Sequence, residues 1–136
     1  INSYFVKKSG LYHYLYTAKR NYNDFLLGES VKLKKYFYVL RPLLACKWIL
    51  AEGTPPPILF KTLMDKYLDE DVKPDVLKLL DLKMNTPEIT EGKRFDRVND
   101  YIDKNIAQME EAIKNLLDKH EQRWEELNKI FIDLLG

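Results

Sequence analysis

The chain is poor in the residues from which most metal and redox sites are built. In 136 residues it has one cysteine, Cys46, and two histidines, His13 and His120. A single cysteine forms no internal disulfide, which excludes a disulfide-stabilised scaffold and favours the reducing cytoplasm as the location. Two histidines so far apart build no metal site from local spacing. Cys46 lies in an apolar stretch, so we expect a small core residue there rather than a nucleophile.

Catalytic motifs are missing as well. The five glycines form no phosphate-binding loop, and the sequence contains no HExxH, CxxC or GxSxG pattern. Asp69-Glu70-Asp71 has the spacing of a Mg²⁺-binding pair of aspartates, but it follows a predicted helix and not a strand. At a helix end this spacing does not put both carboxylates on one face, so we interpret the run as a solvated connector. No apolar run approaches the length of a membrane-spanning helix, so no membrane partner is expected.

What the sequence does have is helical periodicity almost throughout. Hydrophobic residues make up 46% of the chain and recur at spacings of three and four. This pattern predicts an all-α fold, a bundle of five to six helices in a single helical domain over residues 1–136. We find no convincing strand, hairpin signal or internal repeat. The predicted helices cover residues 11–27, 31–51, 58–68 and 74–84, followed by a long C-terminal amphipathic helix from Phe95, with a break near residues 119–122 and further apolar residues at Leu127, Ile130, Phe131 and Leu134.

Short local signals define the expected helix ends. Gly28 is the predicted C-cap of the first helix, and Ser30 is the predicted N-cap of the second. Gly53 should end the second helix, because glycine readily adopts the left-handed conformation of a C-terminal cap. Pro74 should open the fourth helix, where its missing N–H group costs nothing. Thr86-Pro87-Glu88 also has a proline at a position where a helix could begin, so it predicts a further helix start.

Positive charge is concentrated in the first part of the chain. Residues 1–51 contain nine Lys or Arg and two Asp or Glu, a net charge of +7, whereas the remainder has 13 basic and 19 acidic residues, a net charge of −6. A basic region of this kind suits an anionic partner such as a phosphate group. The alternative is internal complementarity, in which basic helices pack beside acidic ones. Charge alone favours neither interpretation.

Residues 31–51 have two distinct faces when they are placed on a helix at about 100° per residue. One face gathers side chains for the core: Leu33, Tyr36, Leu40, Leu43 and Leu44. The opposite face gathers Lys34, Tyr38, Arg41, Ala45 and Trp48. Ammonium, guanidinium and aromatic groups on one face are suited to bind phosphate and to stack on a base. Pro42 removes a backbone hydrogen bond and should bend the helix, which favours a cleft. The alternative is a helix buried on both sides whose charged side chains reach water.

The preceding predicted helix interleaves aromatic and basic residues, as nucleotide- and RNA-binding surfaces often do. These residues are Tyr12, Tyr14, Tyr16, Lys19, Arg20 and Tyr22. Seven of the nine tyrosines lie before Val39, in the same part of the chain as the excess positive charge. Tyrosine is also an ordinary residue at the edge of a helical core, so this observation adds weight to the binding interpretation without deciding it.

Part of the chain resembles the C-terminal helical region of a bacterial and phage family of predicted nucleotidyltransferases. This is the RlaP-like RNA repair pathway group of the DNA polymerase beta superfamily. The resemblance is carried by GLYHYLYTAKRNYNDFL, by GESVKLKKYFYVLRPLLACKWI and by GTPPP. It is closest over residues 10–60 and most specific at KKYFYVLRPLLACKWI followed by GTPPP. Beyond Lys66 it is a similarity of helical pattern and length.

The resemblance implies a function that is divided between two domains. In that superfamily an α/β domain with a Gly-Ser motif and metal-binding aspartates transfers a nucleoside monophosphate from an NTP with Mg²⁺. A helical domain helps to form the nucleotide or acceptor pocket. The resemblance therefore implies that residues 1–136 are the helical domain, a C-terminal fragment of a larger nucleotidyltransferase whose catalytic domain is missing. It assigns a phosphate- or substrate-facing role to Lys34, Lys35, Tyr38 and Arg41, and no catalytic or metal-binding residue.

The same resemblance sets the expected partners. They are a nucleotide, RNA bound through the basic N-terminal helices, and the missing catalytic domain. Whether the chain forms an oligomer is left undecided by the resemblance. Mg²⁺ and NTP are expected for the intact protein and no cofactor for this chain alone. Two alternatives stand beside this interpretation. One is a complete helical module that binds RNA or another anion, and the other is a structural bundle that oligomerises through its long C-terminal helix.

Overall fold

The computed structural model describes the backbone of residues 3–135 and the side chains of residues 8–123, 125–130 and 132–134. The side chain of Phe131 therefore lies outside the described part of the chain. Within it the prediction of an all-α bundle with a long C-terminal helix is confirmed. The elements are α1 (Ser3–Phe25), β1 (Ser30–Lys32), α2 (Lys35–Glu52), α3 (Phe60–Tyr67), α4 (Lys73–Asn85), β2 (Glu91–Lys93) and α5 (Asp96–Leu135).

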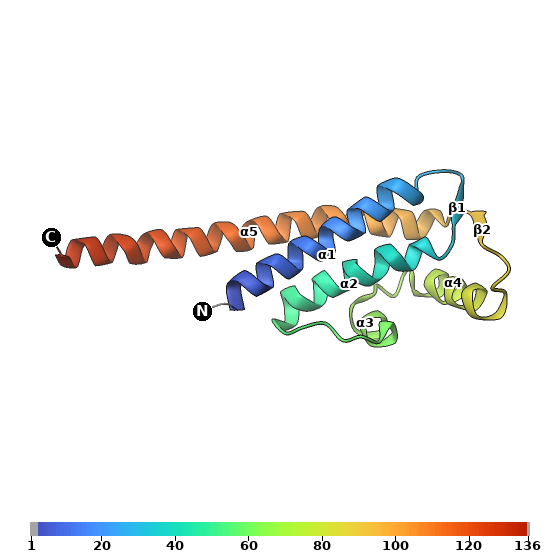
Figure 1. The fold of residues 1–136 in the computed structure, drawn as a ribbon, viewed down its shortest axis with the longest axis horizontal. Helices are drawn as coiled ribbons and strands as arrows, with labels where there is room; N and C mark the ends of the chain where they lie inside the picture. The colour runs from blue at the N-terminus through green and yellow to red at the C-terminus, as the bar shows by residue number, and fades with distance from the viewer. Residues whose placement is uncertain (1–2, 136) are drawn as a thin grey trace.

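The central element is α2. In Figure 1, α1 and the first half of α5 lie along it, and α3 and α4 lie below it. Ten of its 18 residues are buried, so apolar burial against several neighbours provides most of the driving force for its position. The core face predicted from the sequence is confirmed, because all of its members are buried: Leu33, Tyr36, Leu40, Leu43 and Leu44.

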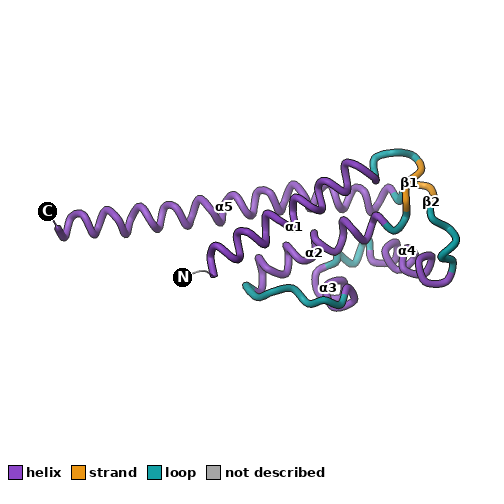
Figure 2. The backbone as a smooth tube through the Cα atoms, in the orientation of Figure 1, coloured by secondary structure: helices purple, strands orange, loops and turns teal. Residues whose placement is uncertain are grey.

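Two short strands, which the sequence analysis did not predict, form an antiparallel pair (Figure 2). The expected N-cap, Ser30, is instead a strand residue that pairs with Lys93. The pairing extends one step further, since the Leu33 N–H donates to the Thr90 carbonyl at 3.1 Å. The helix start expected at Thr86-Pro87-Glu88 is also wrong, because this segment turns into β2. The hydrogen bonds between the two strands use backbone N–H and C=O groups that a helix in either segment would have needed.

The end of α1 differs from the prediction for a related reason. The helix ends at Phe25, and Gly28 does not adopt the positive φ of a glycine C-cap. The carbonyls just beyond the end of the helix are bound by side chains from distant residues. The Asn99 amide donates to the Leu26 carbonyl at 2.6 Å, and the Arg94 guanidinium donates to the Leu27 carbonyl at 3.0 Å. Tertiary contacts thus fix the chain where it leaves α1, at the place where a glycine cap was expected.

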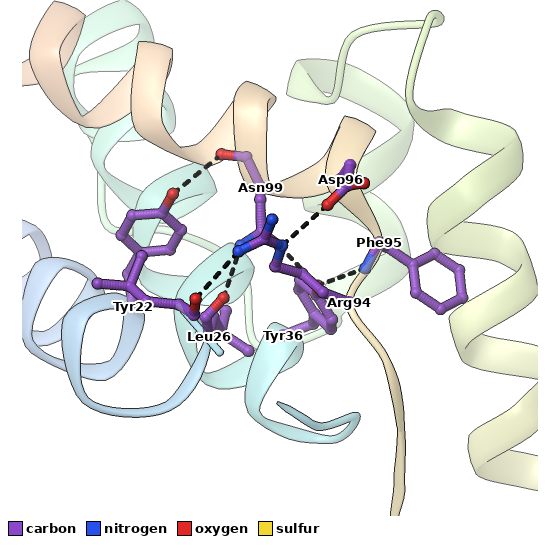
Figure 3. A network of polar contacts seen from close by, with 8 residues as sticks. Tyr22, Leu26, Tyr36, Arg94, Phe95, Asp96 and Asn99 are labelled. Atoms are coloured by element: carbon purple, nitrogen blue, oxygen red, sulfur yellow. Dashed lines mark hydrogen bonds and ion pairs between the residues drawn. The ribbon is translucent and has the colours of Figure 1, made fainter. Parts of the chain in front are cut away.

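A buried polar network joins the ends of three helices (Figure 3). The Tyr36 hydroxyl of α2 donates to the Asn99 side-chain oxygen at 2.5 Å and accepts the Phe95 N–H at 2.8 Å. The Tyr22 hydroxyl of α1 donates to the Asn99 carbonyl at 3.4 Å. Burial raises the pKa of Tyr36 to about 12, because the tyrosinate would lose its solvation. The network fixes where α1, α2 and α5 meet.

The long helix α5 runs without interruption from Asp96 to Leu135. The break expected near residues 119–122 is therefore wrong. No glycine or proline lies in this stretch, and its Glu, Lys, Gln and Arg residues favour helix. The second half of α5 extends beyond the bundle in Figure 1. Within residues 3–135, no helix has both the length and the apolar composition needed to cross a membrane.

Candidate functional site

A pocket of about 500 Å³ opens where α1, α2, α3 and α4 meet. Its floor is α2, whose Pro42 is buried and whose Tyr38 and Arg41 are exposed at the surface. Pro42 has no N–H group, so the Tyr38 carbonyl lacks its usual helical donor at the pocket. The complete lining is His13, Tyr14, Thr17, Asn21, Phe37, Tyr38, Arg41, Pro42, Phe60, Leu80 and Lys83.

Arg41 is fixed in this pocket by the segment before α3. Its Nη1 donates to the Ile58 carbonyl at 2.6 Å, and its guanidinium carbon lies 5.6 Å from the centre of the Phe60 ring. The ring of Phe60 in turn meets Phe37 edge to face, with 5.6 Å between centroids. One hydrogen bond leaves most of the five guanidinium N–H donors for a ligand. Arg41 is therefore oriented without being neutralised.

A second pocket, of about 220 Å³, adjoins the first and shares Phe37 and Lys83 with it. Lys34 stands at this second pocket, immediately before α2. The remaining wall is mainly apolar and comes from α4 and the connection to β2. Its lining is Leu33, Lys34, Phe37, Leu79, Leu82, Lys83, Pro87, Ile89 and Thr90.

The four predicted site residues lie close together, but they do not all line the pockets. Tyr38 and Arg41 line the larger pocket, and Lys34 lines the smaller one. Lys35 lines neither. Its ammonium lies 4.1 Å from the centre of the Phe25 ring and 4.5 Å from that of Tyr38, within cation–π range of both. Lys35 therefore supports the Tyr38 ring, while the binding role assigned to the four stays a prediction.

The rest of the helical face predicted with them is used differently. Ala45 is only 2% exposed and belongs to the core. Trp48 lies further along α2, where its Nε1 donates to the Thr54 hydroxyl at 3.1 Å. Its ring meets Tyr67 edge to face at 5.7 Å, and the Lys66 ammonium lies 4.9 Å from the centre of its ring. Trp48 thus packs against α3 and is absent from the lining of both pockets.

The aromatic and basic residues of α1 do not form one continuous surface. Tyr14 lines the larger pocket, but Tyr22 is buried in the polar network. Lys19 forms an ion pair with Glu110 of α5 at 3.3 Å. Tyr12 lies at another hollow, between α1 and α5, which is also lined by Glu110, Asp118 and Glu121. The internal complementarity considered as an alternative therefore applies to part of α1.

Sequence reasoning missed the part of the site that does not belong to residues 31–51. Lys83 of α4 lines both pockets, and its ammonium lies 5.0 Å from the centre of the Phe37 ring. Phe60 and His13 come from two further helices. Helical periodicity places Lys83 on the exposed side of α4 but carries no information that α4 faces Phe37. Only the tertiary packing brings these groups together.

The charged side chains that line the two pockets are all basic. Their linings include the cations Lys34, Arg41 and Lys83 and, among the described residues, no Asp or Glu. No carboxylate that the structure describes forms an ion pair with these three side chains. The described residues also contain no group of three or more His, Cys, Asp or Glu that fits a metal ion. The arrangement suits an anion with planar groups rather than a cation.

The chain is similar to a known protein family and to a curated bacterial protein. The model of the family described as "RlaP: RNA repair pathway DNA polymerase beta family" matches residues 1–133. The Bacillus subtilis (strain 168) protein named "Uncharacterized protein YcgL" is 38% identical over 130 residues, which are 95% of this chain and 50% of that protein. The chain thus spans about half the length of this curated relative. No solved structure matches it.

Proposed function

Since the chain belongs to the RlaP family, the RNA repair pathway DNA polymerase beta family, we propose that it is the helical nucleotide-binding domain of an Mg²⁺-dependent nucleotidyltransferase. The observation that carries the proposal is the larger pocket, in which cationic and aromatic side chains converge without a carboxylate. In the intact enzyme this domain would hold a nucleoside triphosphate or its acceptor while another domain transfers the nucleoside monophosphate.

The pocket offers complementary groups for the two parts of a nucleotide. The guanidinium fork of Arg41 matches the geometry of phosphate oxygens, and it lies at the pocket with donors to spare. The rings of Tyr38 and Phe60 offer stacking faces for a base. Thr17 and Asn21 contribute polar groups on α1, although each already donates to its own helix backbone. Together these residues would bind and orient the nucleotide.

The residues that the structure describes do not fit a catalytic Mg²⁺ ion. Magnesium sites of phosphoryl-transfer enzymes use one or two carboxylates together with the substrate phosphates. Neither pocket has a carboxylate among its described lining residues, and Asp69-Glu70-Asp71 lies in neither lining. The metal ligands would therefore come from an α/β domain in a longer protein. The half of the Bacillus relative outside the match leaves room for such a domain.

The test is nucleotide binding to the 136-residue chain and to its Lys34→Ala and Arg41→Ala variants, alone and combined. Each charge-assisted hydrogen bond to phosphate contributes about 1.5–3 kcal/mol, so we expect each variant to bind ATP about tenfold more weakly or worse. Isothermal titration calorimetry measures the affinity, and far-ultraviolet circular dichroism verifies that helix content is unchanged. The chain alone should transfer no nucleotide.

Lys61→Ala is the matched control. Lys61 is an exposed lysine of α3 next to Phe60, and it lines neither pocket. Its removal changes the net charge as Lys34→Ala does, so it should leave ATP affinity within about twofold, the small effect of a screened surface charge. Unchanged affinity in the folded Lys34→Ala, Arg41→Ala double variant would refute the proposed binding site.

A further inference from the structure

The two pockets adjoin along α2, because they share Phe37 and Lys83, and together they are called the groove. Lys34, Tyr38 and Arg41 succeed one another at helical spacings of four and three, which places them on one face of the chain. From Lys34 to Arg41 the rise is about 10 Å, at roughly 1.5 Å per residue. Phe37 and Lys83 line both pockets and therefore lie where the two meet. The groove has a cation at each end and a third in the middle.

Each pocket combines a cation with an apolar surface. The larger has Arg41 with the rings of Tyr38 and Phe60, and the smaller has Lys34 with apolar side chains that include Leu82 and Ile89. A single-stranded nucleic acid repeats in the same way, because a phosphate and a base alternate along it. Proteins that bind such strands use rings for the bases and cations for the backbone. An NTP carries a single base, so its base would occupy only one of the two pockets.

Lys83 is held at the junction by a contact that does not neutralise it. Its ammonium lies 5.0 Å from the centre of the Phe37 ring, within cation–π range. It makes no ion pair with a described carboxylate. The Phe37 ring meets Phe60 edge to face, so this contact is itself part of a packed aromatic pair. A phosphate that bridges the two pockets would meet a positioned and uncompensated charge.

We propose that the joined pockets hold two successive units of a single-stranded oligonucleotide, with the Lys83 ammonium at the phosphate between them. The inference rests on the proposed nucleotide-binding function and assigns to the same site the acceptor strand as its ligand. Because the groove presents cations and no described carboxylate, binding needs no divalent metal ion. Arg41 and Lys34 then lie next to the phosphates on either side.

The experiment compares AMP with the dinucleotide pApA in buffer that contains EDTA, by titration calorimetry on the 136-residue chain. The dinucleotide adds a charge-assisted contact and a second base that packs against the apolar wall of the smaller pocket, so we expect it to bind at least about tenfold more tightly than AMP. Lys83→Gln should abolish this gain, whereas Lys83→Arg should retain most of it. With a longer oligoadenylate, Lys83→Gln should reduce the slope of log K against log salt by about 0.7, the value for one phosphate contact in a single strand.

Lys78→Gln is the matched control, because Lys78 lies on the same helix and its ammonium lies 5.9 Å from the centre of the Phe95 ring. It lines neither pocket, so the gain from AMP to pApA should survive its substitution. Equal affinities for AMP and pApA, or equal gains in the Lys83→Gln and Lys78→Gln variants, overturn the inference. If ATP binds while pApA gains nothing, the inference alone is wrong. If neither ATP nor AMP nor pApA binds, the proposed function is wrong with it.

Discussion

Two hydrogen bonds meet at the Tyr36 hydroxyl, which donates to Asn99 and accepts from the Phe95 N–H. Tyr36 is fully buried and Asn99 is 6% exposed, so the Asn99 side-chain oxygen has little access to water when the hydroxyl is removed. A buried polar group without a partner costs more than a hydrogen bond contributes on average. This single oxygen thus joins the start of α5 to α2, the helix that carries most of the predicted site residues.

Tyr36→Phe should lower the free energy of unfolding by about 1–3 kcal/mol, because it leaves the Asn99 side-chain oxygen and the Phe95 N–H unpaired. Tyr22→Phe is the matched control, since the Tyr22 hydroxyl makes one long bond of 3.4 Å to the Asn99 carbonyl. It should cost less than about 1 kcal/mol. Chemical denaturation measures both variants, and equal losses would contradict the role assigned to Tyr36.

The pH dependence of Tyr36 gives this prediction a second measurement. Burial raises its pKa from 10.0 to about 12, so the neutral hydroxyl is favoured in the folded state. Its contribution to stability is complete below about pH 10 and is lost as the pH rises toward about 12. In that interval the free energy of unfolding of the wild type should fall more steeply than that of Tyr36→Phe, by up to about 1.4 kcal/mol per pH unit. Parallel slopes would contradict the buried, protonated state.

At the scale of single elements, the ends of α2 and α1 show how much the sequence could predict. Gly53 ends α2 as expected, with φ of 72° and its N–H donating to the Ile49 carbonyl at 2.9 Å. The signal there is local, because only glycine adopts this conformation without strain. Gly28 carried the same signal and does not cap α1. Just after α1, the carbonyls of Leu26 and Leu27 accept hydrogen bonds from Asn99 and Arg94, about 70 residues away, and no local sequence pattern predicts these contacts.

Gly53→Ala should therefore lower the free energy of unfolding by about 1–2 kcal/mol, since the left-handed conformation strains a residue with a Cβ atom. Gly10→Ala should do the opposite. Gly10 lies inside α1, and an added Cβ would meet Ile49 at 3.7 Å, an ordinary contact. Replacing a helix-interior glycine by alanine stabilises by about 0.5–1 kcal/mol. Urea denaturation of both variants tests the pair, and changes of the same sign would contradict the two backbone assignments.

The strands were missed for the same physical reason as the cap. Each has three residues, and Val31 is paired with Gly92 across 60 intervening residues. Such short segments show too little alternation of apolar and polar residues to be recognised as strands, and the glycine in the second segment weakens its pattern further. Helices, by contrast, repeat their pattern over many turns. That is why the core face of α2 was predicted in full.

At the scale of the whole molecule, the candidate site divides in the same way. Periodicity and the family resemblance together predict Lys34, Tyr38 and Arg41, which lie on α2 or immediately before it. Lys83 and Phe60 follow from neither, because their place in the groove depends on how α3 and α4 pack against α2. A sequence pattern thus predicts the residues on one face of a pocket. The residues of the opposite wall become known only when the three-dimensional fold is known.

The outer half of α5 is the other large-scale feature, and it bears on the alternative of an oligomerising bundle. From Asp118 onward every described side chain is exposed, and Leu127, Ile130 and Leu134 are 56%, 57% and 81% exposed. The last fully packed core residue of this helix is Ile113. The described side chains of the final turns thus add no burial to the bundle, and the apolar ones among them are available to a partner.

Removing residues 122–136 should leave the free energy of unfolding of a dilute sample within about 0.5 kcal/mol of the intact chain, because no described buried contact is lost. The far-ultraviolet helix signal should fall in proportion to the residues removed. A second copy bound along α5 would give a different result. The unfolding midpoint of the intact chain would then rise with protein concentration, and truncation would lower it and abolish that dependence. Sedimentation velocity on both chains measures the association directly, and a truncated chain that is much less stable at every concentration would show that the outer turns of α5 support the bundle itself.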